Sequence, residues 1–321
     1  MRIQPFYSTK LGRAYLGESL EILGDLPDES TNLIVTSPPF PLTFQKKKPY
    51  ESVPIDRYVG WFLAYAEHFK RVLKQDGSLV IDIGGVWNKG NPTRSLYQCH
   101  LLIALCEQVG FHFAQDFYWY NPGAIPAPAE WVNVRRIRVK SAVNLVWWLG
   151  KTPWPKANNK NVLKQYSVDM IRLLKRGYRS KERPSGHNVT SKFQRNHGGA
   201  IPPNLLELGN NDSNGNYLKR CDAAGLPVHP ARFPRGLPEF FIRLCSDPGD
   251  LVLDPFAGSN ITGEAAERLG RKWVAVEMSK EYLEGSKFRF EVAPLRFARE
   301  KRSRSQGLLP LEFPTIVTAS S

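Results

Sequence analysis

Apolar residues in the first 150 positions alternate between two spacings. Short apolar runs at residues 33–35, 78–83, 113–120 and 142–149 predict strands, and the aromatic residues of 58–73 recur at helical spacing. A second helix is expected near residues 94–109. Strand–helix–strand alternation is typical of parallel pairing. The pattern therefore predicts an α/β fold with a doubly wound, mostly parallel sheet.

The alternation stops after residue 150 and resumes near residue 226. Between them the chain is rich in Asn, Gly, Pro and basic residues and has little apolar periodicity. A helix near 237–245, a strand at 250–254, a helix at 264–269 and a strand at 272–277 follow. We predict four segments: the first half of the sheet at 1–150, an inserted recognition region at 151–225, the second half of the sheet at 226–292, and a basic tail at 293–321.

A turn of unusual composition, Ser37-Pro38-Pro39-Phe40, follows the first apolar strand. Consecutive prolines fix φ and remove two backbone donors, so the turn presents carbonyl acceptors in a preset geometry. Ser37 adds an acceptor hydroxyl, and Phe40 offers a flat face. This set suits an exocyclic NH2 on an aromatic base, because two acceptors take its two protons while the ring is held flat. A chance Ser-Pro-Pro in a surface loop is the alternative.

A second turn lies between two predicted strands near the end of the sheet. The first strand ends at Asp254, and a turn containing Gly258 leads into a helix that Ser259 or Asn260 can cap. The next strand ends at Glu277, 19 residues after Gly258, near the spacing at which such an acid meets ribose hydroxyls. The turn departs from G-x-G-x-x-G. An adenosine-containing ligand without a pyrophosphate therefore fits better than NAD.

The charge of the chain favours a polyanionic partner. The formal net charge is +14, and residues 151–200 carry twelve Lys or Arg against only Asp169 and Glu182. Neutralising phosphates supplies most sequence-independent affinity for DNA, so this segment is a candidate DNA surface. Two further basic groups, Lys46-Lys47-Lys48 and Arg135-Arg136, are expected to meet phosphates, with a solvated charge run as the alternative.

Several other classes of protein fit poorly. No stretch approaches 18 consecutive apolar residues and the start lacks the apolar core of a signal peptide, so a cytoplasmic protein is expected. The four cysteines form no C-x-x-C pair, and none follows a proline, which argues against covalent catalysis at a ring carbon. Neither they nor the scattered histidines suggest a metal site.

Together, the two turns resemble those of the amino-methylating DNA methyltransferases of the β arrangement, in which the catalytic half precedes the cofactor half. Ser37-Pro38-Pro39-Phe40, rather than Asp-Pro-Pro-Tyr, is similar to the N4-cytosine enzymes of restriction–modification systems. The stretches at 198–204 and 229–234 also resemble the PvuII type. The resemblance covers roughly residues 15–292. It implies a Rossmann-like methyltransferase sheet, S-adenosylmethionine as cofactor and double-stranded DNA as substrate.

The residues and the resemblance together give three sets of candidate positions. The expected catalytic residues are Ser37, Pro38, Pro39, Phe40 and Asp82. The expected cofactor-binding residues are Glu18, Phe233, Asp254, Phe256, Gly258, Ser259, Asn260 and Glu277. The expected DNA-binding residues are Lys46, Lys47, Lys48, Arg135, Arg136, Arg172, Lys175, Arg176, Arg179 and Arg183.

Some of these assignments keep an ordinary structural alternative. Asp82 precedes Gly84-Gly85 and is either a catalytic group or a turn-forming acid. One residue of Tyr118-Trp119-Tyr120 is expected to flank an extruded base or, as aromatic strand residues more often do, to pack in the core. Glu18 matches the acid that faces the cofactor's adenine in the family, but it also suits the start of a helix.

The predicted reaction is direct methyl transfer to the N4 amine of a flipped cytosine. Ser37 and the Pro38 carbonyl are expected to accept the amine protons and to favour the tetrahedral nitrogen that forms. N6-adenine specificity remains the main alternative; a glutamine-amide methyltransferase and a non-catalytic DNA-binding regulator are less favoured. A cognate restriction endonuclease is a possible functional partner. The sequence leaves open whether the protein is a monomer or a dimer.

Overall fold

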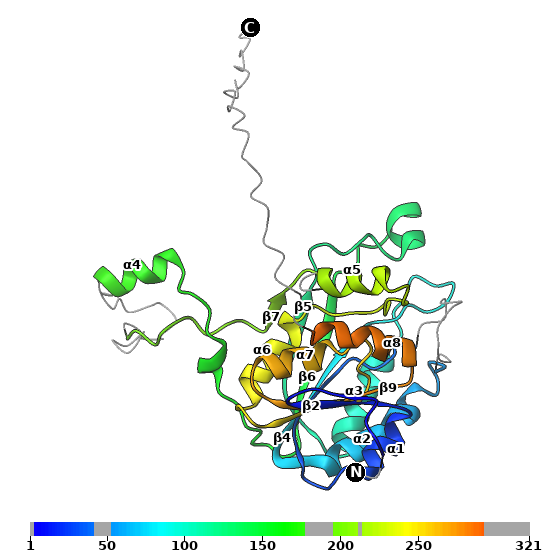
Figure 1. The fold of residues 1–321 in the computed structure, drawn as a ribbon. Coiled ribbons are helices and arrows are strands. Elements are labelled where there is room, and N and C mark those ends of the chain that lie inside the picture. Colours follow the sequence, from blue (N-terminus) through cyan, green and yellow to red (C-terminus); the bar gives the residue numbers. More distant parts are fainter. Residues whose placement is uncertain (1–2, 42–52, 177–194, 211–213, 292–321) are drawn as a thin grey trace, which may run out of the picture. The chain divides into compact units, whose positions relative to one another are not determined.

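The computed structural model describes residues 3–41, 53–176, 195–210 and 214–291. In these ranges nine strands form one sheet of order β1-β2-β9-β8-β3-β4-β6-β5-β7 (Figure 1). The strands are β1 (Tyr7–Ser8), β2 (Gly12–Leu16), β3 (Thr31–Thr36), β4 (Leu73–Ile83), β5 (His112–Tyr120), β6 (Val143–Gly150), β7 (Leu205–Glu207), β8 (Leu251–Asp254) and β9 (Lys272–Glu277).

Helices connect the strands and cover both faces of the sheet (Figure 1). The α-helices are α1 (Ser19–Asp25), α2 (Tyr58–Val72), α3 (Tyr97–Glu107), α4 (Val168–Arg176), α5 (Gly215–Ala223), α6 (Gly236–Cys245), α7 (Ile261–Arg268) and α8 (Lys280–Ser286). Three short turns are η1 (Glu130–Val134), η2 (Asn159–Val162) and η4 (Lys287–Arg289). Every helix of the described part is too short or too polar to cross a membrane.

Two hydrophobic cores lie on opposite faces of the sheet because side chains alternate along each strand. Ile34 of β3 packs with α1, α2 and α3, whereas its neighbours Leu33 and Val35 pack with α6 and α7. The strands β2, β9, β8, β3 and β4 are parallel neighbours. This confirms the predicted doubly wound, mostly parallel fold, and it brings the carboxyl ends of these strands to one edge.

The far side of the sheet differs from the predicted run of parallel strands. β6 lies between β4 and β5 and is antiparallel to both. Residues 121–142, which join β5 to β6, contain only the single turn η1 and no crossover helix. A parallel pair is usually joined by a crossover helix that packs on the sheet, and in the absence of such a helix from this connection the chain returns antiparallel.

The segment predicted as an insert, 151–225, also contributes to the sheet and its covering helices. Strand β7 pairs in parallel with β5, and its Leu206 is buried against the core of that face. Helix α5 buries Tyr217 and Cys221 and packs against α8 and η4. Helix α4, by contrast, buries none of its residues. The predicted basic tail at 293–321 lies outside the described residues.

Candidate active site

A cavity of about 490 Å³ opens at the carboxyl ends of β3, β4, β8 and β9. Open α/β sheets bind ligands at this edge. Of the residues predicted to be catalytic or cofactor-binding, all but Asp254 and Asn260 line it. They are Glu18, Ser37, Pro38, Pro39, Phe40, Asp82, Phe233, Phe256, Gly258, Ser259 and Glu277.

A hydrogen-bonded group of three side chains forms one end of the cavity. Ser37 Oγ donates to Asp82 Oδ2 at 3.0 Å, and Asn144 Nδ2 donates to Asp82 Oδ1 at 3.3 Å. Ser37 and Asp82 come together because β3 and β4 are parallel neighbours, with Thr36 opposite Ile81. The expectation that both lie at the same sheet edge is confirmed.

Burial sets the protonation behaviour of Asp82. Its side chain is 4% exposed, and loss of hydration raises the pKa of its carboxyl to about 7, although the hydrogen bonds from Ser37 and Asn144 act in the opposite direction. A carboxyl group in this range exchanges its proton near neutral pH. That behaviour is suited to a group that takes part in proton transfer.

Aromatic rings stand beside this group. The Phe40 ring lies so close to Gly84 that a Cβ there would be 2.5 Å from Phe40 Cε2, so only glycine permits this ring position. Trp119 of β5 also lines the cavity and donates from Nε1 to Leu208 O at 3.0 Å. Of the three aromatic residues Tyr118, Trp119 and Tyr120, Trp119 is the one that lines the cavity. Its ring also packs in the core, together with the nearby Phe117.

The other end of the cavity is built around a second buried carboxylate, that of Glu277. Its Oε2 accepts from Gly258 N at 2.9 Å, and its Oε1 accepts from Ser279 N at 2.8 Å. Burial raises the pKa of this carboxyl, and the backbone N–H groups oppose the shift. Each carboxylate oxygen keeps a lone pair for a further donor, such as a ribose hydroxyl.

Gly258 occupies a tight position between this acid and His229. Its φ is 51°, and a Cβ would lie 2.9 Å from His229 Nε2. His229 Nδ1 is 2.6 Å from Ala231 O, and because a carbonyl only accepts, Nδ1 carries the proton. Burial lowers the pKa of His229 to about 4, so the ring is neutral.

One wall of the cavity is formed by three aromatic rings that are tilted relative to one another. Phe256 lies 5.8 Å from the Trp61 ring and 5.0 Å from the Tyr65 ring, centroid to centroid. Glu18 lies at the edge of this wall, where Oε1 accepts from Tyr65 Oη at 2.6 Å and Oε2 accepts from Leu20 N at 2.6 Å. Glu18 therefore caps α1 and also lines the cavity. Its predicted place beside the cofactor's adenine stays a prediction.

Asp254 and Asn260 shape the turn from outside the cavity. Asp254 accepts from Thr36 Oγ1 at 2.8 Å and from Thr262 Oγ1 at 2.7 Å, and burial raises its pKa to about 6. Asn260 has φ 55° and caps α7 by accepting from Gly263 N at 3.1 Å. Both residues join elements of the fold and are not part of the cavity lining.

The described residues among those predicted to bind DNA are not part of the cavity lining. Those within the described ranges, Arg135, Arg136, Arg172, Lys175 and Arg176, are exposed. Arg135 pairs with Glu130 at 2.7 Å, and Arg172 pairs with Asp169 at 3.2 Å. Such exposed pairs are weak and leave the cations available to phosphates. Lys46, Lys47, Lys48, Arg179 and Arg183 lie outside the described residues.

Sequence reasoning missed several cavity residues that come from distant segments. Asn144 is the most informative, because it is the one amide inside the apolar run of β6. An isolated polar residue in a buried strand is a usable signal for a site. The sequence pattern predicts Trp61 and Tyr65 only as core positions of a helix. Among the described residues, no group of three His, Cys, Asp or Glu is arranged to hold a metal ion.

Comparison with known proteins agrees with this geometry. A family model, N6_N4_Mtase, described as DNA methylase, matches residues 31–288. The type II methyltransferase M.PvuII of Proteus hauseri is 51% identical over 290 residues, covering 89% of this chain and 86% of the relative. The DNA adenine methyltransferase YhdJ of Escherichia coli (strain K12) is 25% identical over 291 residues, covering 88% and 84%.

A solved structure supports the same relationship. The PvuII DNA methyltransferase (cytosine-N4-specific) superimposes with a TM-score of 0.74 at 46% sequence identity, covering 91% of this chain and 90% of that chain. These matches include residues from both ends of the cavity. This chain therefore belongs to the N6_N4_Mtase family of DNA methylases.

Proposed function

We propose that this protein transfers a methyl group from S-adenosylmethionine to the exocyclic N4 of a cytosine flipped out of duplex DNA. The observation that carries the proposal is the hydrogen bond from Ser37 to the buried Asp82, beside a Pro38-Pro39 turn that has no backbone N–H. This end of the cavity offers acceptors to an amine. The 51% identical relative M.PvuII and the cytosine-N4-specific PvuII structure support the choice of base.

The residues at the other end fit S-adenosylmethionine. Glu277 holds the Gly258 turn and keeps lone pairs for ribose hydroxyls, and Phe256 with Trp61 and Tyr65 gives an aromatic wall against which adenine can pack. A cavity of about 490 Å³ accommodates a nucleoside with an amino-acid arm together with a base. When bound, the cofactor supplies an electrophilic methyl group.

Ser37 is suited to activate the amine. The N4 lone pair is delocalised into the cytosine ring until the amine protons are drawn out of the ring plane. Because Ser37 donates its own proton to Asp82, its oxygen is free to accept one from the amine, and the Pro38 carbonyl accepts the other. Both acceptors also stabilise the positive charge that develops on nitrogen.

Asp82 gives the released proton a destination. One proton leaves N4 for Ser37 Oγ while the Ser37 proton passes to Asp82 Oδ2, so serine ends unchanged and the carboxylate ends protonated. A carboxyl with a pKa of about 7 accepts this proton and returns it to water at neutral pH. Asn144 holds the second carboxylate oxygen and fixes its orientation.

Flipping a base costs a few kcal/mol, which stacking and phosphate contacts offset. Phe40 and Trp119 border the acceptor end and supply flat surfaces for the extruded base. We propose that the basic segment beginning at residue 151, with Arg135 and Arg136, holds the duplex. We further propose that the protein acts in the cytoplasm as the modification enzyme of a restriction–modification system.

N6-adenine is the second candidate target, because the adenine methyltransferase YhdJ matches a similar share of the chain. Its identity is about half that of M.PvuII, which favours cytosine. Plasmid DNA treated with the protein and S-adenosylmethionine, then digested to nucleosides, identifies the base by mass. N4-methylcytosine is expected. N6-methyladenine replaces the proposal with the second candidate, and cofactor binding without any modified nucleoside points to a non-catalytic DNA-binding protein.

A further inference from the structure

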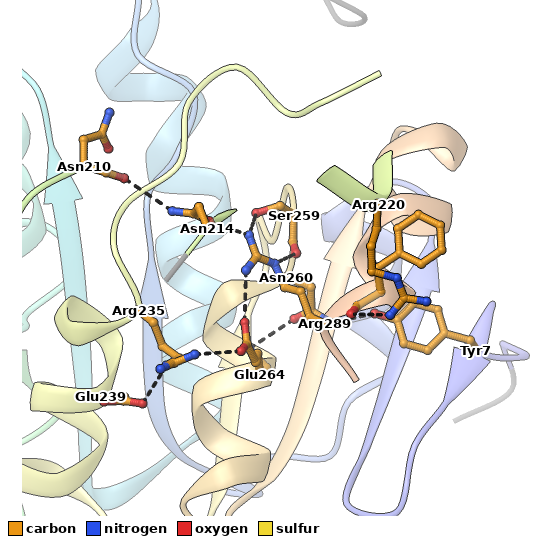
Figure 2. Close-up of polar contacts among 12 residues, drawn as sticks. Tyr7, Asn210, Asn214, Arg220, Arg235, Glu239, Ser259, Asn260, Glu264 and Arg289 are labelled. Atoms are coloured by element: carbon orange, nitrogen blue, oxygen red, sulfur yellow. Dashed lines mark hydrogen bonds and ion pairs between the residues drawn. The ribbon is translucent and has the colours of Figure 1, made fainter. Parts of the chain in front are cut away.

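Arg289 lies at the centre of a group of polar contacts with Ser259, Glu264 and Asn214 (Figure 2). Its side chain is 1% exposed, and it comes from the short turn η4 after α8. The guanidinium donates from Nε to Ser259 O at 2.6 Å and from one terminal nitrogen to Ser259 Oγ at 2.9 Å. Arg289 does not line the cavity, whereas Ser259 does. Ser259 therefore gives Arg289 one contact with the cavity lining. A second runs through Asn214, which accepts from Arg289 at 2.8 Å and donates to the backbone oxygen of Asn210, another lining residue, at 3.3 Å.

The chemistry of the guanidinium fixes the role of the Ser259 hydroxyl. Arginine has donors and no acceptor, so Ser259 Oγ accepts from it. The hydroxyl then keeps its own hydrogen to donate to another group. Arg289 thereby occupies one acceptor site of Ser259 Oγ and leaves its hydrogen available to a ligand in the cavity.

Acidic partners hold Arg289 in this position. Its other terminal nitrogen is 3.0 Å from Glu264 Oε2, and Arg235 is 3.0 Å from Glu264 Oε1 (Figure 2). Arg235 also pairs with Glu239 at 2.9 Å. The two arginines and two glutamates balance in charge. The Arg289 plane also stacks over the Tyr217 ring, 4.3 Å from its centroid.

The backbone of the turn is held from two sides. Gly258 and Asn260, on either side of Ser259, have φ of 51° and 55° in the left-handed region. Glu277 accepts from the N–H of Gly258, and Arg289 donates to the carbonyl of Ser259. The turn is therefore held at two points. One is Glu277, which is proposed to bind the ribose, and the other is Arg289, next to the Ser259 hydroxyl and the start of α7.

We propose that Arg289 is a positioning residue that directs the Ser259 hydroxyl to the carboxylate of the cofactor's amino-acid arm. The assignment rests on the proposed function. A hydroxyl whose hydrogen is free to donate and the first N–H groups of α7 both favour an anion at this point. The carboxylate is the anionic group of S-adenosylmethionine. Arg289 lies one residue beyond the family match at 31–288, so that match assigns it nothing.

The test compares two ligands that differ in the amino-acid arm. S-adenosylhomocysteine carries the carboxylate, and 5′-methylthioadenosine lacks the arm. Arg289→Lys removes the paired hydrogen bonds to Ser259, because an ammonium lacks the planar fork. Arg235→Lys is the matched control: it disturbs the same ion pairs at Glu264 without touching Ser259.

We expect Arg289→Lys to raise the dissociation constant for S-adenosylhomocysteine by about 10-fold to 100-fold, the range for removal of a hydrogen bond to a charged group. Binding of 5′-methylthioadenosine is expected to change less than about 3-fold, and Arg235→Lys to leave both ligands within the same limit. Equal weakening for the two ligands, or no weakening for either, would overturn the assignment.

Ser259→Ala covers the case in which Arg289→Lys does not fold. It removes only the hydroxyl, and we expect the same selective weakening of S-adenosylhomocysteine binding. In the double variant the two effects should not add, because they remove one interaction. Additive effects contradict the proposal. If the unaltered protein binds S-adenosylhomocysteine but forms no N4-methylcytosine, the proposed function fails while the role of Arg289 is still decided by these measurements.

Discussion

The two ends of the cavity each contain a buried carboxylate, and the two differ in what holds them. Asp82, 4% exposed, accepts from the side chains of Ser37 and Asn144. Glu277, 6% exposed, accepts from the backbone N–H groups of Gly258 and Ser279. The first carboxylate contacts a turn with two prolines through Ser37, and the second contacts a turn that contains Gly258.

Because of this difference, Asp82 is suited to change its charge, whereas Glu277 is suited to remain a hydrogen-bond acceptor. A serine hydroxyl can donate or accept, so the surroundings of Asp82 can adjust when its proton moves. A backbone N–H only donates, so Glu277 is held as an acceptor. Burial raises the pKa of both, to about 7 for Asp82. We therefore expect damage at one end to affect the chemical step and damage at the other to affect cofactor binding.

The largest effect is expected from Ser37→Ala. Loss of one acceptor in the transition state should cost roughly 2–4 kcal/mol of barrier, seen as a lower kcat in single-turnover assays. Cofactor affinity, measured by calorimetry on the same preparation, should be unchanged because Ser37 lies at the opposite end from Glu277. Near-normal turnover contradicts the catalytic assignment.

Glu277→Ala should produce the complementary defect. A ribose loses a charged acceptor, and the Gly258 N–H loses its partner, so binding of S-adenosylmethionine should weaken by about 1.5–3 kcal/mol. DNA affinity measured without cofactor is the control and should change little. If the affinities for cofactor and DNA fall together, the variant has lost its fold, and the effects of the two ends of the cavity cannot be measured independently.

Asp82→Asn tests the titration directly. In the unaltered protein the folded pKa is about 7 against 3.8 for an unperturbed Asp carboxyl, so the folded state holds the proton more tightly over this window. Unfolding free energy should therefore fall as pH rises from about 4 to about 7, by up to about 1.4 kcal/mol per pH unit from this group. The Asn variant lacks that component of the slope.

Activity should follow the opposite trend with pH. Ser37 donates to the ionised form of Asp82, so kcat of the unaltered protein should rise as pH passes through about 7. Asp82→Asn should lower kcat and remove this rise. Identical pH dependence of stability and rate in the two proteins would show that Asp82 does not titrate in this range.

The smallest effect per residue is expected on the basic surface, away from both ends. Neutralising Arg172, Lys175 and Arg176 should reduce DNA affinity and flatten its salt dependence, by about 0.9 in log–log slope for each phosphate that is no longer neutralised. Arg268, Lys272 and Lys280, exposed in the cofactor half, form a control of equal charge change. An equal reduction in the control would mean that net charge alone is responsible.

The site residues that were predicted at the two ends of the cavity could be found from local sequence patterns. The strand before Ser37 and the strand before Gly258 both have apolar runs that end in turn residues, and local signals of this kind survive in the fold. The alternation also predicted that Ser37 and Asp82 share an edge. These features belong to single segments or to neighbouring parallel strands.

The features that were missed depend on strand order and on packing between distant segments. Asn144 reaches Asp82 only because β6 inserts antiparallel beside β4, which no local pattern specifies. Arg289 reaches Ser259 from 30 residues away, through packing of the last turn of the domain. β7 joins the sheet from a segment with little apolar content. Each of these features depends on tertiary contacts and not on local propensity.

The position of β7 has a consequence for how such enzymes diversify. Residues 151–204 begin after β6 and end at β7, and both strands are neighbours of β5 in the sheet. Because loop closure depends only weakly on length, a segment anchored at two such points can be exchanged as a unit. Trp119 of β5, paired with Leu206, keeps its place at the cavity during such an exchange. Under the proposed role of this segment in holding the duplex, such an exchange would change the DNA sequence that is bound and leave Ser37 and Asp82 in place.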